Sequence, residues 1–134
     1  MQKNIITTGK RKRAIAKATI KEGKGNVFIN RKKLEFFPWL NQLEIKEPLM
    51  IAKEILKELN FDIYVNVKGG GISSQTEATR LAIAKAIVAY TKNDQIRRAY
   101  LSYDKALLVA DTRRNEPHKP RDSKARAKRQ KSYR

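Results

Sequence analysis

The first thirty residues show the alternation of apolar and polar side chains that is typical of short β-strands. Residues 4–8 are rich in β-branched side chains and predict a first strand, which the four cations from Lys10 to Arg13 should end. Between Ala14 and Lys21 small apolar residues occupy every second position, which predicts a second strand with one buried face. The turn sequence of residues 23–26 then predicts that residues 27–30 return as the hairpin partner of that strand.

Helical periodicity appears in the second half of the chain. Pro48 directly follows Glu47, and this pair predicts the first turn of an amphipathic helix that ends near Asn60. Residues 61–68 alternate again and predict a strand with one buried face.

The remaining part of the domain is predicted to be mainly helical. Ser74 is followed three residues later by Glu77, which predicts a capping box and a helix that continues to about Tyr90. This helix is apolar nearly all round, so it should be the central and most buried one. We expect a short helix over residues 95–101, and residues 107–109 should form a short strand or a docked apolar segment.

Three aromatic side chains surround Pro38, namely Phe36, Phe37 and Trp39. Aromatic rings beside cations can stack on bases. A compact group of this kind more often closes the end of a hydrophobic core, and we favour that interpretation.

The net charge of +18 changes the picture because it is unevenly distributed. Residues 1–33 carry +10, residues 34–110 carry +1, and residues 111–134 carry +7. A nearly neutral middle between two cationic ends is typical of nucleic-acid binding. The chain has no cysteine, which excludes disulfides and thiolate chemistry, and no apolar run long enough for a membrane span. We expect a cytoplasmic protein without metal or cofactor, since the single histidine, His118, has no second ligand nearby.

Two cationic clusters, residues 10–13 and 31–33, flank the predicted hairpin. Either one alone would favour a solvated surface, but the pair without balancing acids favours phosphate contact. The glycines at residues 69–71 follow a strand and precede a helix, an arrangement that presents backbone N–H groups to an anion. The alternative is that these glycines only make a tight turn.

The C-terminal segment, residues 111–134, holds ten Lys or Arg among its 24 residues and no Val, Ile, Leu, Phe, Met or Trp. Such a segment cannot repay the entropy of ordering by apolar burial, so we expect it to be an intrinsically disordered basic arm on a globular α+β domain of residues 1–110. A solubilising tail is the alternative. Fully extended, the arm spans up to about 80 Å, which suits a distant RNA site.

Three stretches of the sequence together resemble the ribosomal protein S9 family of the small subunit, in its archaeal form. They are TGKRKRAIAKATI, VKGGGISSQTEATRLAIAKAI and LLVADTRRNEPHKPRDSKARAKRQKSYR. The resemblance implies a two-layer α+β domain, with a mixed four-stranded sheet packed on helices, a left-handed β-α-β crossover and an extended basic C-terminal tail. It also implies binding to ribosomal RNA of the subunit head (the 3′ major domain), contacts with neighbouring ribosomal proteins, and a tail tip that reaches P-site transfer RNA.

The expected RNA contacts combine the cationic clusters, the glycine loop and the arm. The residues expected to bind ribosomal RNA are Lys10, Arg11, Lys12, Arg13, Arg31, Lys32, Lys33, Gly69, Gly70, Gly71, Ser73, Ser74, Gln75, Arg97, Arg98, Arg113, Arg114, His118, Lys119, Arg121, Lys124, Arg126, Lys128 and Arg129. The residues expected to reach transfer RNA are Lys131, Tyr133 and Arg134.

Two other classes of function compete with this one. An enzyme would need an acid, a base or a nucleophile placed in a pocket, and the glycine loop is the only feature of the sequence that favours one. A DNA-binding architectural protein shares the charge argument, but the chain has no helix-turn-helix, zinc-finger or basic-zipper pattern.

Overall fold

The computed structural model describes residues 4–118, 123–124, 126–127 and 132. Within these residues the main sheet has five strands, β1 (Ile5–Arg11), β2 (Ala14–Glu22), β3 (Val27–Ile29), β4 (Lys32–Lys33) and β5 (Phe61–Lys68). Their order across the sheet is β1-β2-β5-β3-β4, with β3 and β5 parallel and the other neighbours antiparallel. The expected α+β class and mixed sheet are confirmed.

The predicted count of four strands is wrong, because the cationic segment after β3 adds a fifth. Residues Asn30 and Arg31 both have positive φ, 49° and 67°, and form the two-residue turn that pairs Ile29 with Lys32. Positive φ at both turn positions is the geometry that matches the twist of a hairpin. The expected pairing of residues 14–21 with residues 27–30 is also wrong, since β5 lies between β2 and β3.

Asp62 explains locally how β5 comes to lie there. Its carboxylate Oδ1 accepts hydrogen bonds from the backbone N–H of Lys24 at 3.0 Å and of Asn26 at 2.9 Å. The turn after β2 is therefore held against the start of β5 rather than closed on β3. The chain then crosses from β3 through α1 to the parallel strand β5. The left hand expected for this crossover stays a prediction.

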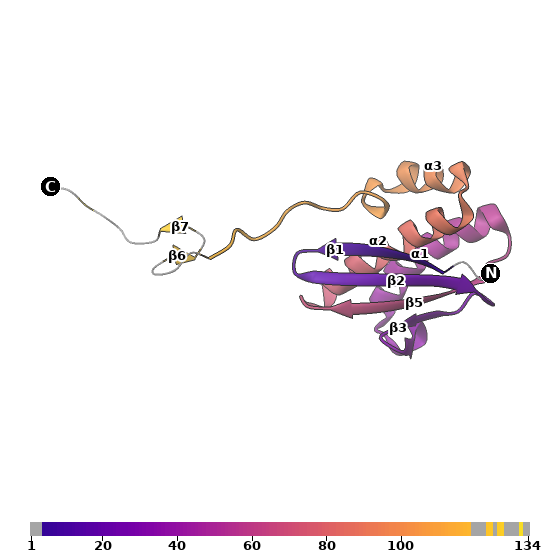
Figure 1. Cartoon of the computed structure of the whole chain (residues 1–134), viewed down its shortest axis with the longest axis horizontal. Coiled ribbons are helices and arrows are strands. Elements are labelled where there is room, and N and C mark those ends of the chain that lie inside the picture. The colour runs from indigo at the N-terminus through magenta and orange to yellow at the C-terminus, as the bar shows by residue number, and fades with distance from the viewer. Residues whose placement is uncertain (1–3, 119–122, 125, 128–131, 133–134) are drawn as a thin grey trace.

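Three α-helices lie in the described part of the chain, α1 (Trp39–Leu56), α2 (Ile72–Thr91) and α3 (Asp94–Tyr103). Two 3-10 turns, η1 (Leu34–Phe36) and η2 (Lys105–Leu107), precede α1 and follow α3. Figure 1 shows α1 and α2 on one side of the sheet, with the other side left open. None of the described helices is both long enough and apolar enough to cross a bilayer.

The first helix differs from its prediction at both ends. It begins at Trp39, so Pro48 lies inside it and not in its first turn, and it ends at Leu56 rather than near Asn60. The earlier start buries Ile45, which is 2% exposed, against the core. The helix ends where Lys57 adopts a positive φ of 66° and its N–H bonds to the carbonyl of Lys53.

The aromatic group around Pro38 does not close the core, which corrects another prediction. Phe36 is 77% exposed and Trp39 is 71% exposed, whereas Leu34 is buried and Phe37 packs partly against the core. The sequence shows that the group is apolar, but its burial depends on whether another element covers it.

The second helix is the most buried, as its composition predicts. Its buried residues include Leu81, Ala82, Ile83 and Ile87. The helix approaches β1 so closely that a Cβ at Gly9 would lie 2.3 Å from the carbonyl oxygen of Ala78. The predicted capping box does not form, because α2 begins at Ile72 with Gly71 as its N-cap and no side chain caps it.

The C-terminal part of the domain docks on the helices. Leu107 is fully buried in η2, which confirms the docked-segment alternative for residues 107–109. Residues 111–118 contain neither helix nor strand, and Figure 1 shows this segment running away from the domain. Farther along, β6 (Ser123–Lys124) and β7 (Arg126–Ala127) pair with each other. The disorder expected for the arm in the free protein stays a prediction.

Tyr100 joins α3 to α1 through a buried hydrogen bond, and this contact generates a prediction of stability. The side chain is fully buried, its hydroxyl donates to the carbonyl oxygen of Pro48 at 2.7 Å, and burial raises the pKa of the phenol. We expect Tyr100→Phe to lower the free energy of unfolding by about 1 kcal/mol, the net value of one such bond. Urea denaturation followed by circular dichroism measures the change.

Tyr103→Phe is the matched control, because the Tyr103 side chain is 58% exposed on the same helix. Its effect should stay within about 0.5 kcal/mol. Equal effects of the two substitutions would show that the bond to Pro48 contributes nothing specific.

Candidate nucleic-acid interface

The turn between β1 and β2 presents the first cationic cluster. The cations were expected to end the first strand, but β1 continues through Lys10 and Arg11. The turn consists of Lys12, with a φ of 53°, and Arg13, between the paired residues Arg11 and Ala14. Lys10, Lys12 and Arg13 are exposed. The turn and the end of β1 therefore present three exposed cations at one end of the sheet.

The glycine loop packs directly on this turn. Gly70 has a φ of 67°, and a Cβ there would lie 2.9 Å from the backbone nitrogen of Ala14. At Gly69 a Cβ would lie 2.6 Å from the carbonyl oxygen of Arg13. Two of the three glycines are thus required by the close approach of two backbones, which supports the turn interpretation for these positions.

Gly71 differs from its two neighbours. Its φ of −94° is open to any residue, and a Cβ there would meet nothing within 4 Å. It is the N-cap of α2, where the first backbone N–H groups have no partner within the helix and the helix dipole favours an anion. Gln75 holds the loop in this position, since its side-chain amide donates to the carbonyl of Gly69 at 3.0 Å.

The second cationic cluster lies toward the same end of the sheet. Asn30 accepts a hydrogen bond from the backbone N–H of Val67 at 2.8 Å and donates to its carbonyl at 3.3 Å. Val67 is two residues from Gly69 at the end of β5. Arg31, Lys32 and Lys33 follow Asn30 and are exposed.

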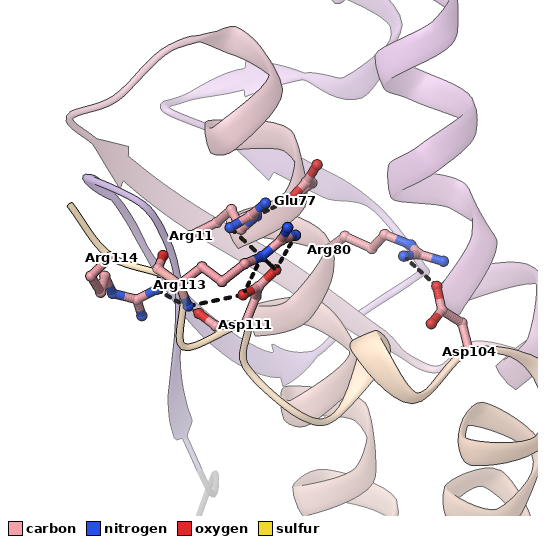
Figure 2. A network of polar contacts seen from close by, with 7 residues as sticks. All are labelled: Arg11, Glu77, Arg80, Asp104, Asp111, Arg113 and Arg114. Atoms are coloured by element: carbon pink, nitrogen blue, oxygen red, sulfur yellow. Dashed lines mark hydrogen bonds and ion pairs between the residues drawn. The ribbon is translucent and has the colours of Figure 1, made fainter.

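The start of the arm is attached to the domain by a network of charged groups (Figure 2). Arg11 contacts the carboxylate of Glu77 at 2.6 Å and that of Asp111 at 3.3 Å. Asp111 also contacts the guanidinium of Arg113 at 2.7 Å. Hydrogen bonds from Arg113 and the attraction of Arg11 hold the pKa of Asp111 well below its ordinary value, and the same pairing raises the pKa of Arg113. Because the pKa of Asp111 is lowered, the pairs are complete at neutral pH and are lost only in strong acid.

The attached arm and the hairpin turn line one groove of about 400 Å³. On the hairpin side stand Lys10, Lys12 and Arg13, and on the arm side stand Arg114, Glu116 and His118, so four cations outnumber one acid. Residues about one hundred positions apart in the chain are thus brought to the same surface. The groove is the most concentrated meeting of predicted RNA-binding residues in the described part of the chain.

Other predicted site residues are not part of this groove. Arg97 and Arg98 are exposed near the start of α3, which follows the end of α2 that is remote from the glycine loop. Arg11 is only 14% exposed and is engaged by two carboxylates. Lys124 and Arg126 belong to β6 and β7, for which the structure describes the backbone but not the side chains. The predicted residues that lie wholly outside the described residues are Lys119, Arg121, Lys128, Arg129, Lys131, Tyr133 and Arg134.

The open face of the sheet carries residues that the sequence analysis did not select. Lys17 and Lys68 lie there, and Lys21 places its Nζ 5.8 Å from the ring centre of Tyr64. Tyr64 in turn stacks on Phe28 with ring centres 5.2 Å apart. The period-two alternation of β2 and β5 would have placed these side chains on one face, because residues opposite the buried set share the other face.

Groups of three or more possible metal ligands are not found among residues 4–118 or the described part of the arm.

Comparison with known proteins identifies the family. The model of the family described as ribosomal protein S9/S16 matches residues 9–134. The chain belongs to this family.

Relatives of this S9/S16 protein cover nearly its full length. The small ribosomal subunit protein uS9 of Methanococcus maripaludis strains C7 and C5 is 51% identical over 135 aligned positions, which cover 98% of this chain and 99% of the relative. The protein of the same name from Methanococcus vannielii is 48% identical over the same shares. The resemblance to the archaeal form of the family is confirmed. S9/S16 proteins are structural and not enzymes, so the enzyme alternative is excluded.

The glycine loop of this S9/S16 chain allows folding and binding to be tested at neighbouring positions. Gly70→Val should lower the free energy of unfolding by about 2 kcal/mol or more, because it forces a side chain into positive φ and onto Ala14. Gly71→Val should cost about 1 kcal/mol or less. If an anion binds at the start of α2, Gly71→Val should still weaken RNA binding about tenfold, the value of one charge-assisted hydrogen bond.

Filter binding of small-subunit RNA, corrected for the folded fraction of each variant, makes the comparison. Unchanged affinity of Gly71→Val would show that the loop serves only as a turn.

Proposed function

We propose that the chain is a structural component of the small ribosomal subunit in the cytoplasm and that the hairpin end of its domain binds ribosomal RNA. The observation that carries this proposal is the groove between the hairpin turn and the arm. Lys12 and Arg13 stand on one side of it and Arg114 and His118 on the other. A groove with cations on both walls suits a phosphate backbone, which gains affinity by releasing its counterions.

The distribution of charge over the fold supports the same surface. The neutral middle of the sequence supplies α1, α2 and β5, which form most of the core, while the two cationic segments meet at the end of the sheet that carries the glycine loop. Asp111 contributes indirectly, since its pairs with Arg11 and Arg113 direct the start of the arm along the hairpin. The protein thus presents one cationic end to RNA.

The open face of the sheet extends this surface. Lys17 pairs across strands with Asn66, and Ile15 with Lys68, so cations and polar groups alternate over β2 and β5. Aromatic rings on an open sheet are a common platform for unstacked RNA bases. We include Tyr64 and the lysines of this face in the proposed RNA contacts.

The family resemblance also supports a proposal for where the protein lies in the small subunit and what it contacts there. We propose that its RNA belongs to the head of the subunit, that neighbouring ribosomal proteins contact the domain, and that the tip of the arm reaches P-site transfer RNA. The small subunit proteins of Methanococcus align with 98% of the chain, and the family match extends through the arm to residue 134. An extended segment of 24 residues can reach about 80 Å from the domain, far enough to meet a second RNA.

The hairpin turn provides the direct test of RNA binding. Lys12→Gln combined with Arg13→Gln should weaken binding to small-subunit RNA and reduce the slope of log affinity against log salt by up to about 1.4–1.8, which corresponds to two lost phosphate contacts. Filter binding at several salt concentrations gives the slope.

Lys53→Gln combined with Lys57→Gln removes the same charge from exposed positions at the end of α1 and serves as the control. Its slope should change far less. Equal changes in the two double variants would mean that overall charge, and not the groove, sets the affinity. Duplex DNA bound as tightly as the RNA would favour the DNA-binding alternative.

The tip of the arm generates a separate prediction, although Arg134 lies outside the described residues. Arg134→Ala should leave incorporation into the small subunit nearly unchanged and weaken P-site transfer RNA binding by up to about 1–3 kcal/mol, the range for a hydrogen bond to a charged group. Removal of the arm from Lys119 onward should impair both. Subunit incorporation and filter binding of transfer RNA are the measurements, and poor incorporation of Arg134→Ala with normal transfer RNA binding would make the tip an assembly anchor.

A further inference from the structure

An exposed apolar surface covers the beginning of α1. Phe36 and Trp39 are more than 70% exposed, and Leu40 and Leu43 follow them at 66% and 41%. Leu40 and Leu43 are three residues apart and therefore lie on the same side of the helix. Large apolar side chains gathered in this way mark an interaction surface.

The charge of this surface differs from that of the rest of the protein. Residues 34–45 contain no Lys or Arg in a chain of net charge +18, and they include the acids Glu35 and Glu44. Both of these acids are exposed. Carboxylates repel a phosphate backbone, so this surface is poorly suited to RNA.

A cleft of about 430 Å³ lies beside the same helix and carries charges of both signs. Glu44 and Glu47 of α1 line it, and its other charged groups are Lys10, Arg11, Glu77, Arg80, Asp104, Asp111 and Arg113. Arg80 contacts both Glu47 and Asp104, so these two carboxylates are already paired (Figure 2 shows the contact with Asp104). Leu40 and Glu44 are four residues apart, so Glu44 lies beside the apolar surface on the same side of α1.

We propose that the beginning of α1 is a docking surface for a second protein, which contributes a Lys- or Arg-rich segment with apolar anchor residues. The anchors would cover Trp39, Leu40 and Leu43, and the cations would meet the exposed acids Glu35 and Glu44. This inference deepens the proposed function, on which it rests, because it assigns a place and a chemistry to a neighbouring protein of the small subunit.

Two other occupants fit less well. The arm of the chain itself is basic, but it contains no Val, Ile, Leu, Phe, Met or Trp to fill an apolar surface. A second copy docking through the same surface would place acids against acids, since a two-fold interface brings the same patch together on both sides. Charge complementarity therefore favours a different, basic protein.

A photo-cross-linking amino acid at Leu40, which is 66% exposed and so tolerates replacement, tests the proposal. The variant chain is reconstituted with small-subunit RNA and the remaining small-subunit proteins, irradiated, and its adducts are mapped by mass spectrometry. We expect an adduct to a protein segment in which cations outnumber acids and apolar residues are present. Adducts to RNA, to a second copy of this chain or to its own arm, or no adduct at all, would overturn the proposal.

Two controls sharpen the result. The same probe at Ile15, which is 49% exposed on the open face of the sheet, should label RNA and not that protein. Glu44→Lys, combined with the probe at Leu40, should reduce the protein adduct about tenfold, as expected for reversing a charge that faces a partner's cations. Glu54→Lys makes the same change at an exposed position near the end of α1 and should leave the yield unchanged.

Incorporation of the unmodified chain separates this inference from the proposed function. A chain that does not enter the particle would overturn both. A chain that enters the particle but gives only RNA adducts from Leu40 would leave the proposed function intact and overturn the docking surface alone. Equal loss of the adduct in Glu44→Lys and Glu54→Lys would also contradict it, since position on the helix would then be irrelevant.

Discussion

The close packing of α2 against β1 and β2 is the constraint on which the rest of the structure depends. It is possible because small residues face each other, with Gly9 and Ala16 on the strands and Ala78 and Ala82 on the helix. A Cβ at Gly9 would lie within 2.8 Å of the backbone nitrogen of Ala82, so any side chain there would push the helix away. With the helix at this depth, its N-terminus meets the hairpin turn, and Glu77 reaches Arg11.

The same packing divides the cations of one end of the domain into two groups. Arg11 and Arg113 are engaged by carboxylates and fix the path of the arm. Lys12, Arg13 and Arg114 instead line open grooves. Hydrogen bonds from Arg113 lower the pKa of Asp111, so its carboxylate carries the charge that these contacts need at neutral pH. A small number of ion pairs thus positions cations whose attraction to phosphate is unspecific in itself.

The distribution of surface character separates two kinds of partner on one small domain. The hairpin end and the open sheet face are cationic, whereas the start of α1 is apolar and acidic. A particle built from RNA and protein needs both kinds of surface, because phosphates exclude acidic groups and apolar side chains gain nothing from contact with phosphate. In the proposed docking surface, the exposed Trp39 and Leu40 would contact the protein partner.

Local periodicity by itself determined which face of each element is buried. The inward sets of β2 and β5, from Ala14 to Ile20 and from Phe61 to Val67, and the apolar α2 are buried as their patterns predict, because the side-chain period of an element is fixed by its backbone. The family and the two cationic ends could likewise be identified from the sequence. Only the tertiary structure decided that β5 enters between β2 and β3, that Phe36 and Trp39 stay uncovered, and that His118 lines the same groove as Lys12. These features depend on which distant elements pack together, and that choice is made by the free energy of the whole fold and not by any local stretch of sequence.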